Sequence, residues 1–215
     1  AEHTLALILA LAKNLGRFLS GAQAGDWNPE RTVELSGKTL AVIGCGAIGR
    51  VVARMAAFGL GMRVTGCDTA RLDGDQLRAD CGVASLCSVF GDAVADADVV
   101  SLHLPATEQT AHFMNRERLG QLRPGALLIN TSRGSVVDER ALYDFLSAGR
   151  LGGADLDVYE NEPYRPVGDG KDLRTLETVV MTPHVASNSR EACERMARRA
   201  VENIRLVEIG RASCR

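Results

Sequence analysis

The strongest constraint on the fold is a series of short apolar segments that alternate with segments of helical composition. The apolar segments are KTLAVIG (38–44), MRVTGC (62–67), DVVSLHL (98–104), ALLIN (126–130), GGADLDV (152–158) and ETVVMT (177–182). Strands that are apolar along their whole length are typical of a parallel sheet covered by helices on both faces. Six or seven such strands account for nearly the whole chain. We therefore predict one α/β domain with a doubly wound parallel sheet, and no second complete domain.

Both ends of this sheet system are flanked by predicted helices. The apolar run TLALILALA (4–12) predicts a buried helix that packs on more than one surface. It is too short to span a bilayer, and the preceding residues AEH are not the positively charged start of a signal peptide. The segment GAQAGDWNPE (21–30) has the composition of a polar loop. The last helix is predicted to begin near Asn188, with Asn188 as its N-cap.

Composition narrows the class of function. Apolar residues make up 46% of the chain and charged residues 24%, which is ordinary for a globular protein. The net charge of −2 gives no sign of a nucleic-acid or membrane partner. Six cysteines are scattered without a CxxC pair, so we expect neither a metal site nor a disulfide framework, and we expect a cytoplasmic location.

A glycine-rich loop provides the first functional signal. The segment Gly44-Cys45-Gly46-Ala47-Ile48-Gly49 has the GxGxxG pattern, follows an apolar strand and opens a helix. Gly44 allows a tight turn, Gly46 lets a pyrophosphate approach the backbone, and Gly49 lets helix and strand pack closely. The helix N-terminus at Ala47 and Ile48 offers unpaired N–H groups to phosphates. The alternative is a plain strand–helix turn.

Asp68 favours the nucleotide interpretation. It ends the second apolar segment, 19 residues after Gly49. An acid at this position can accept hydrogen bonds from the ribose hydroxyls of NAD and repel the 2′-phosphate of NADP. The nearest following arginine is Arg71, three residues on. We therefore predict NAD as the cofactor in preference to NADP, with a strand-end turn carboxylate as the alternative role for Asp68.

Polar residues follow three later strands. Arg133 comes after ALLIN, Asp157 and Glu162 come after GGADL, and His184 comes after VVMT. Ligands of open α/β sheets bind beyond the carboxyl ends of the strands, where these side chains would converge. Histidine suits proton transfer near neutral pH, a neighbouring carboxylate stabilises imidazolium, and arginine can hold a substrate carboxylate. Taken alone, a histidine is more often structural than catalytic, and an arginine after a strand is often a solvated charge or a salt-bridge partner.

Several long motifs in register resemble the nucleotide-binding domain of the D-isomer-specific 2-hydroxyacid dehydrogenases. The motifs are AEHTLALILALAKNL, KTLAVIGCGAIG, VVSLHLPATEQTAHFMN, RPGALLINTSRGSVVDERAL, GGADLDVYENEP and TPHVA. The resemblance implies a Rossmann-like fold and NAD-dependent interconversion of a D-2-hydroxy acid and its 2-keto acid. In that reaction Arg133 would bind the substrate carboxylate, His184 would be the general acid/base, and Glu162 would pair with His184. Glutamate rather than glutamine at position 162 distinguishes the chain from the related formate dehydrogenases.

The resemblance also implies the remaining contacts of the cofactor. The residues that would line its site are Leu104, Pro105, Thr110, Thr131, Ser132, Arg133, Asp157 and His184, in addition to the glycine loop and Asp68. Among them, Thr131 and Ser132 would lie near the nicotinamide, and Asp157 would help to orient it. Glu160 is interpreted as a solvated loop charge.

The expected domain organisation is an NAD-binding domain over residues 1–209 and a short tail over 210–215. The substrate-binding domain of the family is expected to be missing from this chain, which leaves the particular 2-hydroxy acid open. The resemblance also implies a homodimer, with the opening helix and its neighbours at the interface. Two alternatives remain: a non-catalytic, NAD-sensing binding protein similar to a corepressor, and an isolated dimerising cofactor-binding domain.

Overall fold

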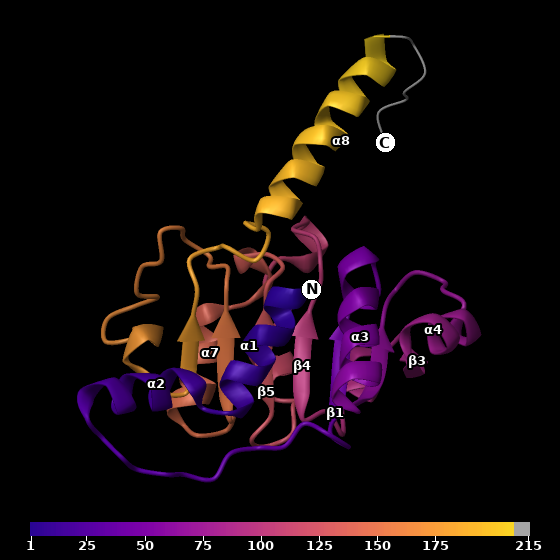
Figure 1. Ribbon diagram of the computed structural model, residues 1–215. Helices are drawn as coiled ribbons and strands as arrows, with labels where there is room; N and C mark the ends of the chain where they lie inside the picture. Colours follow the sequence, from indigo (N-terminus) through magenta and orange to yellow (C-terminus); the bar gives the residue numbers. More distant parts are fainter. Residues whose placement is uncertain (209–215) are drawn as a thin grey trace.

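A computed structural model describes residues 1–208 and contains a sheet of seven parallel strands (Figure 1). The strands are β1 (Thr39–Ile43), β2 (Arg63–Cys67), β3 (Val83–Cys87), β4 (Val99–Leu102), β5 (Leu127–Asn130), β6 (Gly153–Leu156) and β7 (Val179–Met181). Their spatial order is β3-β2-β1-β4-β5-β6-β7. The direction of strand succession reverses between β1 and β4, which is where doubly wound sheets bind ligands. The predicted doubly wound fold is confirmed.

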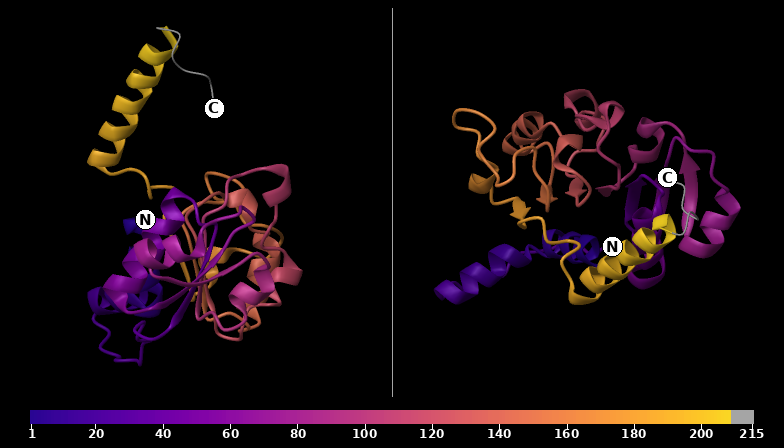
Figure 2. Two further views of the ribbon diagram at one scale, coloured as in Figure 1. Left: turned by 90° about the vertical axis from the view of Figure 1, so that its right-hand side faces the viewer. Right: turned by 90° about the horizontal axis from the view of Figure 1, so that it is seen from above.

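Helices cover both faces of the sheet, as the edge-on view in Figure 2 shows. The bounds of the covering helices are α1 (Glu2–Ala12), α3 (Ala47–Leu60), α4 (Gly74–Cys81), α5 (Phe90–Val94), α6 (Arg116–Leu119) and α7 (Glu139–Ser147). Alternate residues of β1 face opposite sides: Leu40 and Val42 pack with α1, α3 and α4, whereas Ala41 and Ile43 pack with α5, α6 and α7. This two-sided burial explains why the central strands are apolar throughout.

Helix α1 packs against β5, β6 and β7 and against α3. It buries Leu5, Leu7, Ile8 and Leu11. The prediction of a buried helix with several packing surfaces is therefore confirmed. Within residues 1–208, no single helix is long and apolar enough to cross a membrane. Helix α1 and α2 (Leu15–Ala24) satisfy length and composition only as a pair, across a bend of 63°.

Two local predictions about loops and caps were wrong. The loop expected over 21–30 begins later, because α2 continues to Ala24 and ends at Gly25 in a left-handed conformation (φ 89°). The last helix, α8 (Arg190–Glu208), is capped by Ser189 rather than by Asn188. The Ser189 hydroxyl accepts a hydrogen bond from the Ala192 N–H at 3.2 Å. The predicted domain boundary at 209 and the tail over 210–215 lie outside the described residues.

Helix α8 rises from the carboxyl edge of the sheet and projects away from the rest of the protein (Figures 1 and 2). Its apolar residues Met196, Val201 and Ile204 are exposed. The helical spacing predicted from the sequence is thus present, but within the described chain the apolar face of α8 has no covering element.

Candidate active site

The glycine loop joins β1 to α3 at the switch point of the sheet. Gly44 has a φ of 97°, and a Cβ there would lie 2.5 Å from the His103 carbonyl oxygen. A Cβ on Gly49 would collide with the Gly44 carbonyl oxygen. A Cβ on Gly46, at the N-cap of α3, would meet nothing within 4 Å. The first and third glycines are therefore required by packing, whereas Gly46 leaves open space beside the N-terminus of α3.

Asp68 lies directly beside this loop at the end of β2. Its Oδ2 accepts a hydrogen bond from the Cys45 N–H at 2.7 Å, and its Oδ1 accepts one from the Ala70 N–H at 2.8 Å. The carboxylate is half-buried. The structure thus brings Asp68 and the glycine loop together, as the sequence predicted, and also gives the carboxylate a role in holding the loop.

The end of β4 approaches the glycine loop from the other side. His103 follows β4, and desolvation by burial lowers its pKa to about 4. Ser101 and His103 form a hydrogen bond of 2.9 Å between Oγ and Nε2. Next to them, the Thr110 hydroxyl donates to the Pro105 carbonyl oxygen at 2.5 Å and closes the turn that begins at Pro105, directly after Leu104. Thr110 is therefore a turn residue as well as a predicted cofactor contact.

Asn130 builds the turn that carries Arg133. Asn130 is fully buried at the end of β5, and its Oδ1 accepts hydrogen bonds from the N–H and the hydroxyl of Ser132 at 3.0 and 2.8 Å. Its Nδ2 donates to the Arg133 carbonyl oxygen at 3.0 Å. Thr131 instead faces α1, where its hydroxyl lies 2.9 Å from that of Thr4. The exposed Arg133 guanidinium donates to the Ser132 carbonyl oxygen at 2.6 Å. Among the described residues, it forms no hydrogen bond or ion pair with Glu162 or His184.

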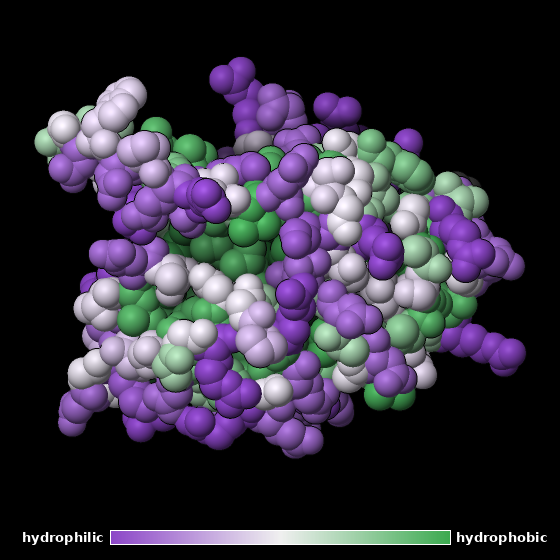
Figure 3. Space-filling model, turned by 90° about the horizontal axis from the view of Figure 1, so that it is seen from below, coloured by the Kyte–Doolittle hydropathy of each residue, from purple (hydrophilic) through white to green (hydrophobic). Residues whose placement is uncertain are grey.

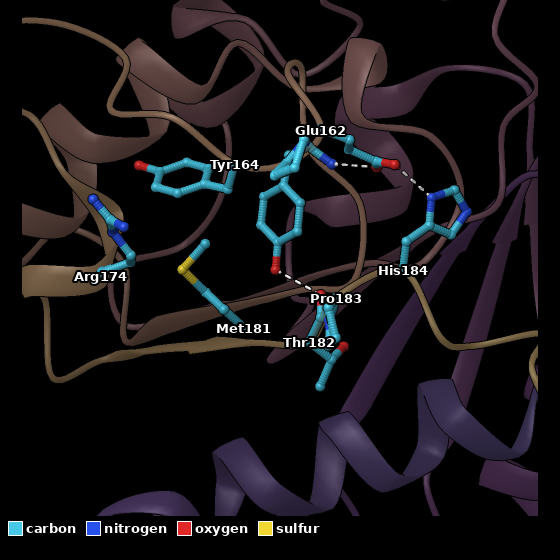
Figure 4. Close-up of a pocket in the computed structure, with 9 residues that line it drawn as sticks. Glu162, Tyr164, Arg174, Met181, Thr182, Pro183 and His184 are labelled. Atoms are coloured by element: carbon cyan, nitrogen blue, oxygen red, sulfur yellow. Dashed lines mark hydrogen bonds and ion pairs between the residues drawn. The ribbon is translucent and has the colours of Figure 1, made fainter.

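Glu162 and His184 form a direct pair across the loops that follow β6 and β7 (Figure 4). Their Oε2 and Nδ1 atoms are 2.7 Å apart, and the other Glu162 oxygen accepts the Tyr159 N–H at 3.1 Å. Partial burial raises the pKa of Glu162, but the hydrogen bonds from His184 and Tyr159 outweigh it and leave this pKa below its usual range. His184 has a φ of 55°, a strained conformation for a non-glycine residue that is often found at functional sites.

Asp157 holds the loop that carries His184. The side chain is fully buried. Its Oδ1 accepts hydrogen bonds from the Thr182 hydroxyl at 2.5 Å and the Val185 N–H at 2.9 Å. Its Oδ2 accepts one from the Ala186 N–H at 2.8 Å. These bonds fix the backbone on both sides of His184. The His3 Nε2 lies 3.4 Å from the same carboxylate. The predicted contact of Asp157 with the nicotinamide remains a prediction, and its structural role in this loop was missed.

Glu160 is an exposed loop residue, as the sequence indicated, but its carboxylate is also bonded to two neighbouring segments. Its Oε1 accepts the Glu139 N–H at 2.9 Å, and its Oε2 lies 3.1 Å from the His112 Nε2. In return, the Glu139 Oε1 accepts the Glu160 N–H at 2.7 Å. No sequence motif indicated this reciprocal pair, because its members are 21 residues apart and meet only through the folded loops.

A cavity of about 580 Å³ lies on one side of the Glu162–His184 pair. Figure 4 shows Tyr164 and Met181 between this pair and Arg174 at the far end. Its walls are mainly apolar, with Tyr159 donating its hydroxyl toward the Thr182 carbonyl oxygen at 2.8 Å. A second apolar hollow is visible on the underside of the protein, at the amino ends of the strands (Figure 3). Among residues 1–208, no group of side chains is arranged to hold a metal ion.

The order of the strands, the glycine loop and the strand-end acid together define a Rossmann-like nucleotide-binding domain. Comparison with known proteins gives the family. The D-isomer specific 2-hydroxyacid dehydrogenase NAD binding domain matches residues 5–186. The chain therefore belongs to this family.

Individual relatives agree with this assignment. The chain is 38% identical to a glyoxylate reductase of Korarchaeum cryptofilum over 95% of its length, and 36% identical to a hydroxypyruvate reductase of Thermotoga maritima over 95%. These matches cover 61% and 64% of the two relatives. The crystal structure of D-lactate dehydrogenase from Aquifex aeolicus, complexed with NAD and lactic acid, has a TM-score of 0.85 at 32% identity and covers 98% of this chain. The chain thus spans about three fifths of the length of these curated relatives.

Proposed function

We propose that this chain is the cofactor-binding part of an NAD-dependent dehydrogenase that interconverts a D-2-hydroxy acid and its 2-oxo acid. The observation that carries the proposal is the 2.7 Å pair of Glu162 and His184 at the carboxyl edge of a nucleotide-binding sheet. Similarity to a glyoxylate reductase, a hydroxypyruvate reductase and a D-lactate dehydrogenase supports this class of substrate. The particular acid is not specified by these residues.

His184 is proposed as the group that exchanges a proton with the substrate. Because the pKa of Glu162 is lowered, its carboxylate remains ionised near neutral pH and accepts a hydrogen bond from the Nδ1–H of His184. The Nε2 atom is then the one that exchanges a proton. During reduction, the imidazolium gives its Nε2 proton to the carbonyl oxygen; during oxidation, the neutral Nε2 removes the proton of the hydroxyl group.

Arg133 is proposed to bind the carboxylate of the substrate. It lies at the end of β5 in a turn that Asn130 fixes, and its guanidinium is exposed. A guanidinium can hold a carboxylate through two parallel hydrogen bonds, which orients the adjacent carbonyl or hydroxyl group as well as binding it. The bond to the Ser132 carbonyl oxygen uses one donor and leaves others for the substrate.

The residues at the switch point fit a dinucleotide. The open space at Gly46 and the unpaired N–H groups of α3 suit a pyrophosphate, and Asp68 lies where a ribose is expected. The proposed contacts at the other end are Leu104, Pro105, Thr110, Thr131, Ser132 and Asp157. When bound, NADH would supply the hydride that reduces the carbonyl carbon. The protein's own task is to hold the substrate and to move the proton.

Asp68 is proposed to select NAD over NADP. Its carboxylate is held beside the glycine loop by two backbone N–H groups, so it presents a fixed negative charge there. A 2′-phosphate placed near this charge would be repelled. Ribose hydroxyls can instead donate hydrogen bonds to the remaining lone pairs of the carboxylate.

A titration of the chain with NADH and NADPH tests the cofactor assignment. We expect NADH to bind at least about tenfold more tightly than NADPH, which corresponds to about 1.4 kcal/mol. Asp68→Asn should narrow this preference, whereas Asp75→Asn, at a 98% exposed carboxylate, should not change it. Equal affinity for both nucleotides in the wild-type chain would refute the role of Asp68. No binding of either would refute the cofactor assignment for this chain.

The alternative of a non-catalytic, NAD-sensing protein makes a different prediction. If the proposed function is right, His184→Gln and Glu162→Gln should bind NADH with nearly wild-type affinity while reduction of 2-oxo acids falls by at least about a hundredfold, the usual contribution of a general acid. A sensing protein would bind NADH and show no turnover before any substitution. The comparison needs the same preparation for binding and for turnover.

We further propose that the protein forms a homodimer through α2 and the segment that follows it. Helix α2 buries none of its residues; its Leu15 and Leu19 are exposed, and the segment that follows it carries Trp27, which is 92% exposed. Light scattering of the wild-type chain should give the mass of a dimer, and Leu19→Glu should shift it to a monomer. A monomeric wild-type chain would contradict this proposal without affecting the cofactor assignment.

A further inference from the structure

Two glutamates lie directly behind the loop that carries Glu162. Glu139, in the first turn of α7, accepts the Glu160 N–H at 2.7 Å, and Glu160, in the loop after β6, accepts the Glu139 N–H at 2.9 Å. Glu160 also bonds to the His112 Nε2 at 3.1 Å, and the His112 N–H donates to the Ser135 carbonyl oxygen at 2.7 Å. These contacts tie three separate segments of the chain together at one point.

The backbone between Tyr159 and Glu160 connects this pair to the proposed proton-transfer residues. The Tyr159 N–H donates to the Glu162 Oε1 at 3.1 Å, and the next N–H along the chain, that of Glu160, donates to Glu139. A Cβ on Gly134 would collide with the Tyr159 carbonyl oxygen, so the turn after Arg133 is in backbone contact with the same peptide. Two consecutive peptide units, on either side of the Tyr159 Cα, therefore adjoin the carboxylate that orients His184 and the Arg133 turn.

The burial of Glu139 makes its position well defined. The residue is 1% exposed, and its Oε2 has no hydrogen-bond partner among the described residues. The titratable groups that face it are Glu160, Glu162 and His112. Burial and the two neighbouring carboxylates raise the pKa of Glu139 to about 7, against the opposing bond from the Glu160 N–H. Burying a carboxyl group that accepts only one backbone hydrogen bond costs free energy, and the fold retains Glu139 in this position despite that cost.

We propose that Glu139 is a positioning residue for the Glu162–His184 pair and that it acts through the Tyr159–Glu160 backbone. Loss of its acceptor oxygen would free the Glu160 N–H, loosen the peptide against Gly134 and release the Tyr159 N–H from Glu162. Glu162 would then lose the hydrogen bond from the Tyr159 N–H, which holds its carboxylate in line with the His184 Nδ1. The importance of this pair rests on the proposed function, but its geometry does not.

The tautomer of His184 is the direct test. In its neutral form, the ring nitrogen that carries the proton is set by the hydrogen bond made to it, so a well-placed Glu162 selects the Nδ1–H form. Imidazole ¹⁵N shifts, detected through the carbon-bound ring protons at alkaline pH, identify the tautomer, and His184→Gln assigns the signal. We expect the Nδ1–H form in the wild-type chain and in Glu139→Gln, whose amide oxygen can still accept the Glu160 N–H. In Glu139→Ala we expect the Nε2–H form to gain at least about tenfold relative to Nδ1–H.

Controls separate positioning from general damage. Glu117→Ala, at an exposed glutamate of α6, should keep the wild-type tautomer. An unchanged tautomer in a folded Glu139→Ala variant would overturn the proposal, as would a wild-type chain without the Nδ1–H form. If Glu139→Ala does not fold, amide exchange in the wild-type chain decides: protection of the Tyr159 and Glu160 N–H groups supports the proposal, and exchange of the Glu160 N–H at the rate of a free loop overturns it.

The tautomer experiment needs neither cofactor nor substrate, so the two proposals can fail separately. Without NADH binding or turnover, but with the expected tautomers, the proposed function fails and the positioning role of Glu139 remains. With NADH binding and an unchanged tautomer in Glu139→Ala, the inference about Glu139 fails and the proposed function remains.

Discussion

Replacing Asp155 with asparagine should stabilise the protein, and the gain should grow with pH. Asp155 lies in the middle of β6, is fully buried, and neither of its carboxylate oxygens has a hydrogen-bond partner among the described residues. It faces the α1 side of the sheet, since its neighbours Ala154 and Leu156 pack into the opposite cluster. Burial, followed by the nearby Asp157, raises the pKa of Asp155 from its ordinary 3.8 to about 7.

The size of the effect follows from this change in pKa. When the pKa of a carboxyl group is higher in the folded state than in the unfolded state, the protein keeps its full stability below the unfolded pKa, at about pH 4. It loses stability as the pH rises from there through the folded pKa. Each pH unit between the two values removes about 1.4 kcal/mol, so the full loss is about 4 kcal/mol above pH 7. Between pH 5 and pH 8 the wild-type chain should lose about 3 kcal/mol through Asp155.

Urea unfolding at pH 5 and pH 8 measures this difference. Asp155→Asn cannot ionise, so its stability relative to the wild type should rise by about 3 kcal/mol between the two pH values. Because Glu139 titrates in both proteins, its contribution cancels when the stability of the wild type is subtracted from that of the variant. Asp96→Asn, at an exposed aspartate, should show a constant difference. A gap between Asp155→Asn and the wild type that does not change with pH would refute the assignment of a buried, unpartnered carboxyl group at this position.

Further expected outcomes concern packing, turns and thiols. Gly49→Ala should weaken NADH binding at least about tenfold in a fluorescence titration, because a Cβ at this position has no space. Gly59→Ala, whose Cβ would meet nothing within 4 Å, should instead stabilise the protein through α3 by about 0.5–1 kcal/mol in thermal unfolding. Asn130→Ala should destabilise the protein by about 1–3 kcal/mol in urea unfolding, because the turn after β5 loses buried partners. Mass spectrometry after alkylation at pH 8 should find the exposed Cys193 modified well before the buried Cys45, whose pKa burial raises to about 11.

The central strands were predictable because both of their faces are buried. Six of the seven strands appeared in the sequence as continuous apolar segments. The strand that was missed, β3, lies at the edge of the sheet, and its Ala84 and Ser85 are exposed. Helix α2 was missed although Leu15, Phe18 and Leu19 have helical spacing, and it buries none of its residues. For β3, the weak apolar pattern reflects the small number of residues that the strand buries.

The candidate site was predictable only in part. The order of the strands places residues that follow β6 and β7 next to each other, and this is sufficient to bring Glu162 and His184 together. The residues that hold them in place could not be found in this way. Asn130 and Glu139 bond to backbone groups of loops, and the direction of a loop N–H depends on dihedral angles that a single sequence does not specify.

Most of the hydrogen bonds that position the carboxylates of this site come from backbone N–H groups. Asp157 receives the N–H groups of Val185 and Ala186, Glu162 receives that of Tyr159, and Asp68 receives those of Cys45 and Ala70. Each carboxylate is thereby held in place by backbone groups of the loops next to it. In the proposed reaction, substrate binding would then not have to order the Glu162–His184 pair, and changes to remote substrate contacts should alter affinity more than the geometry of His184.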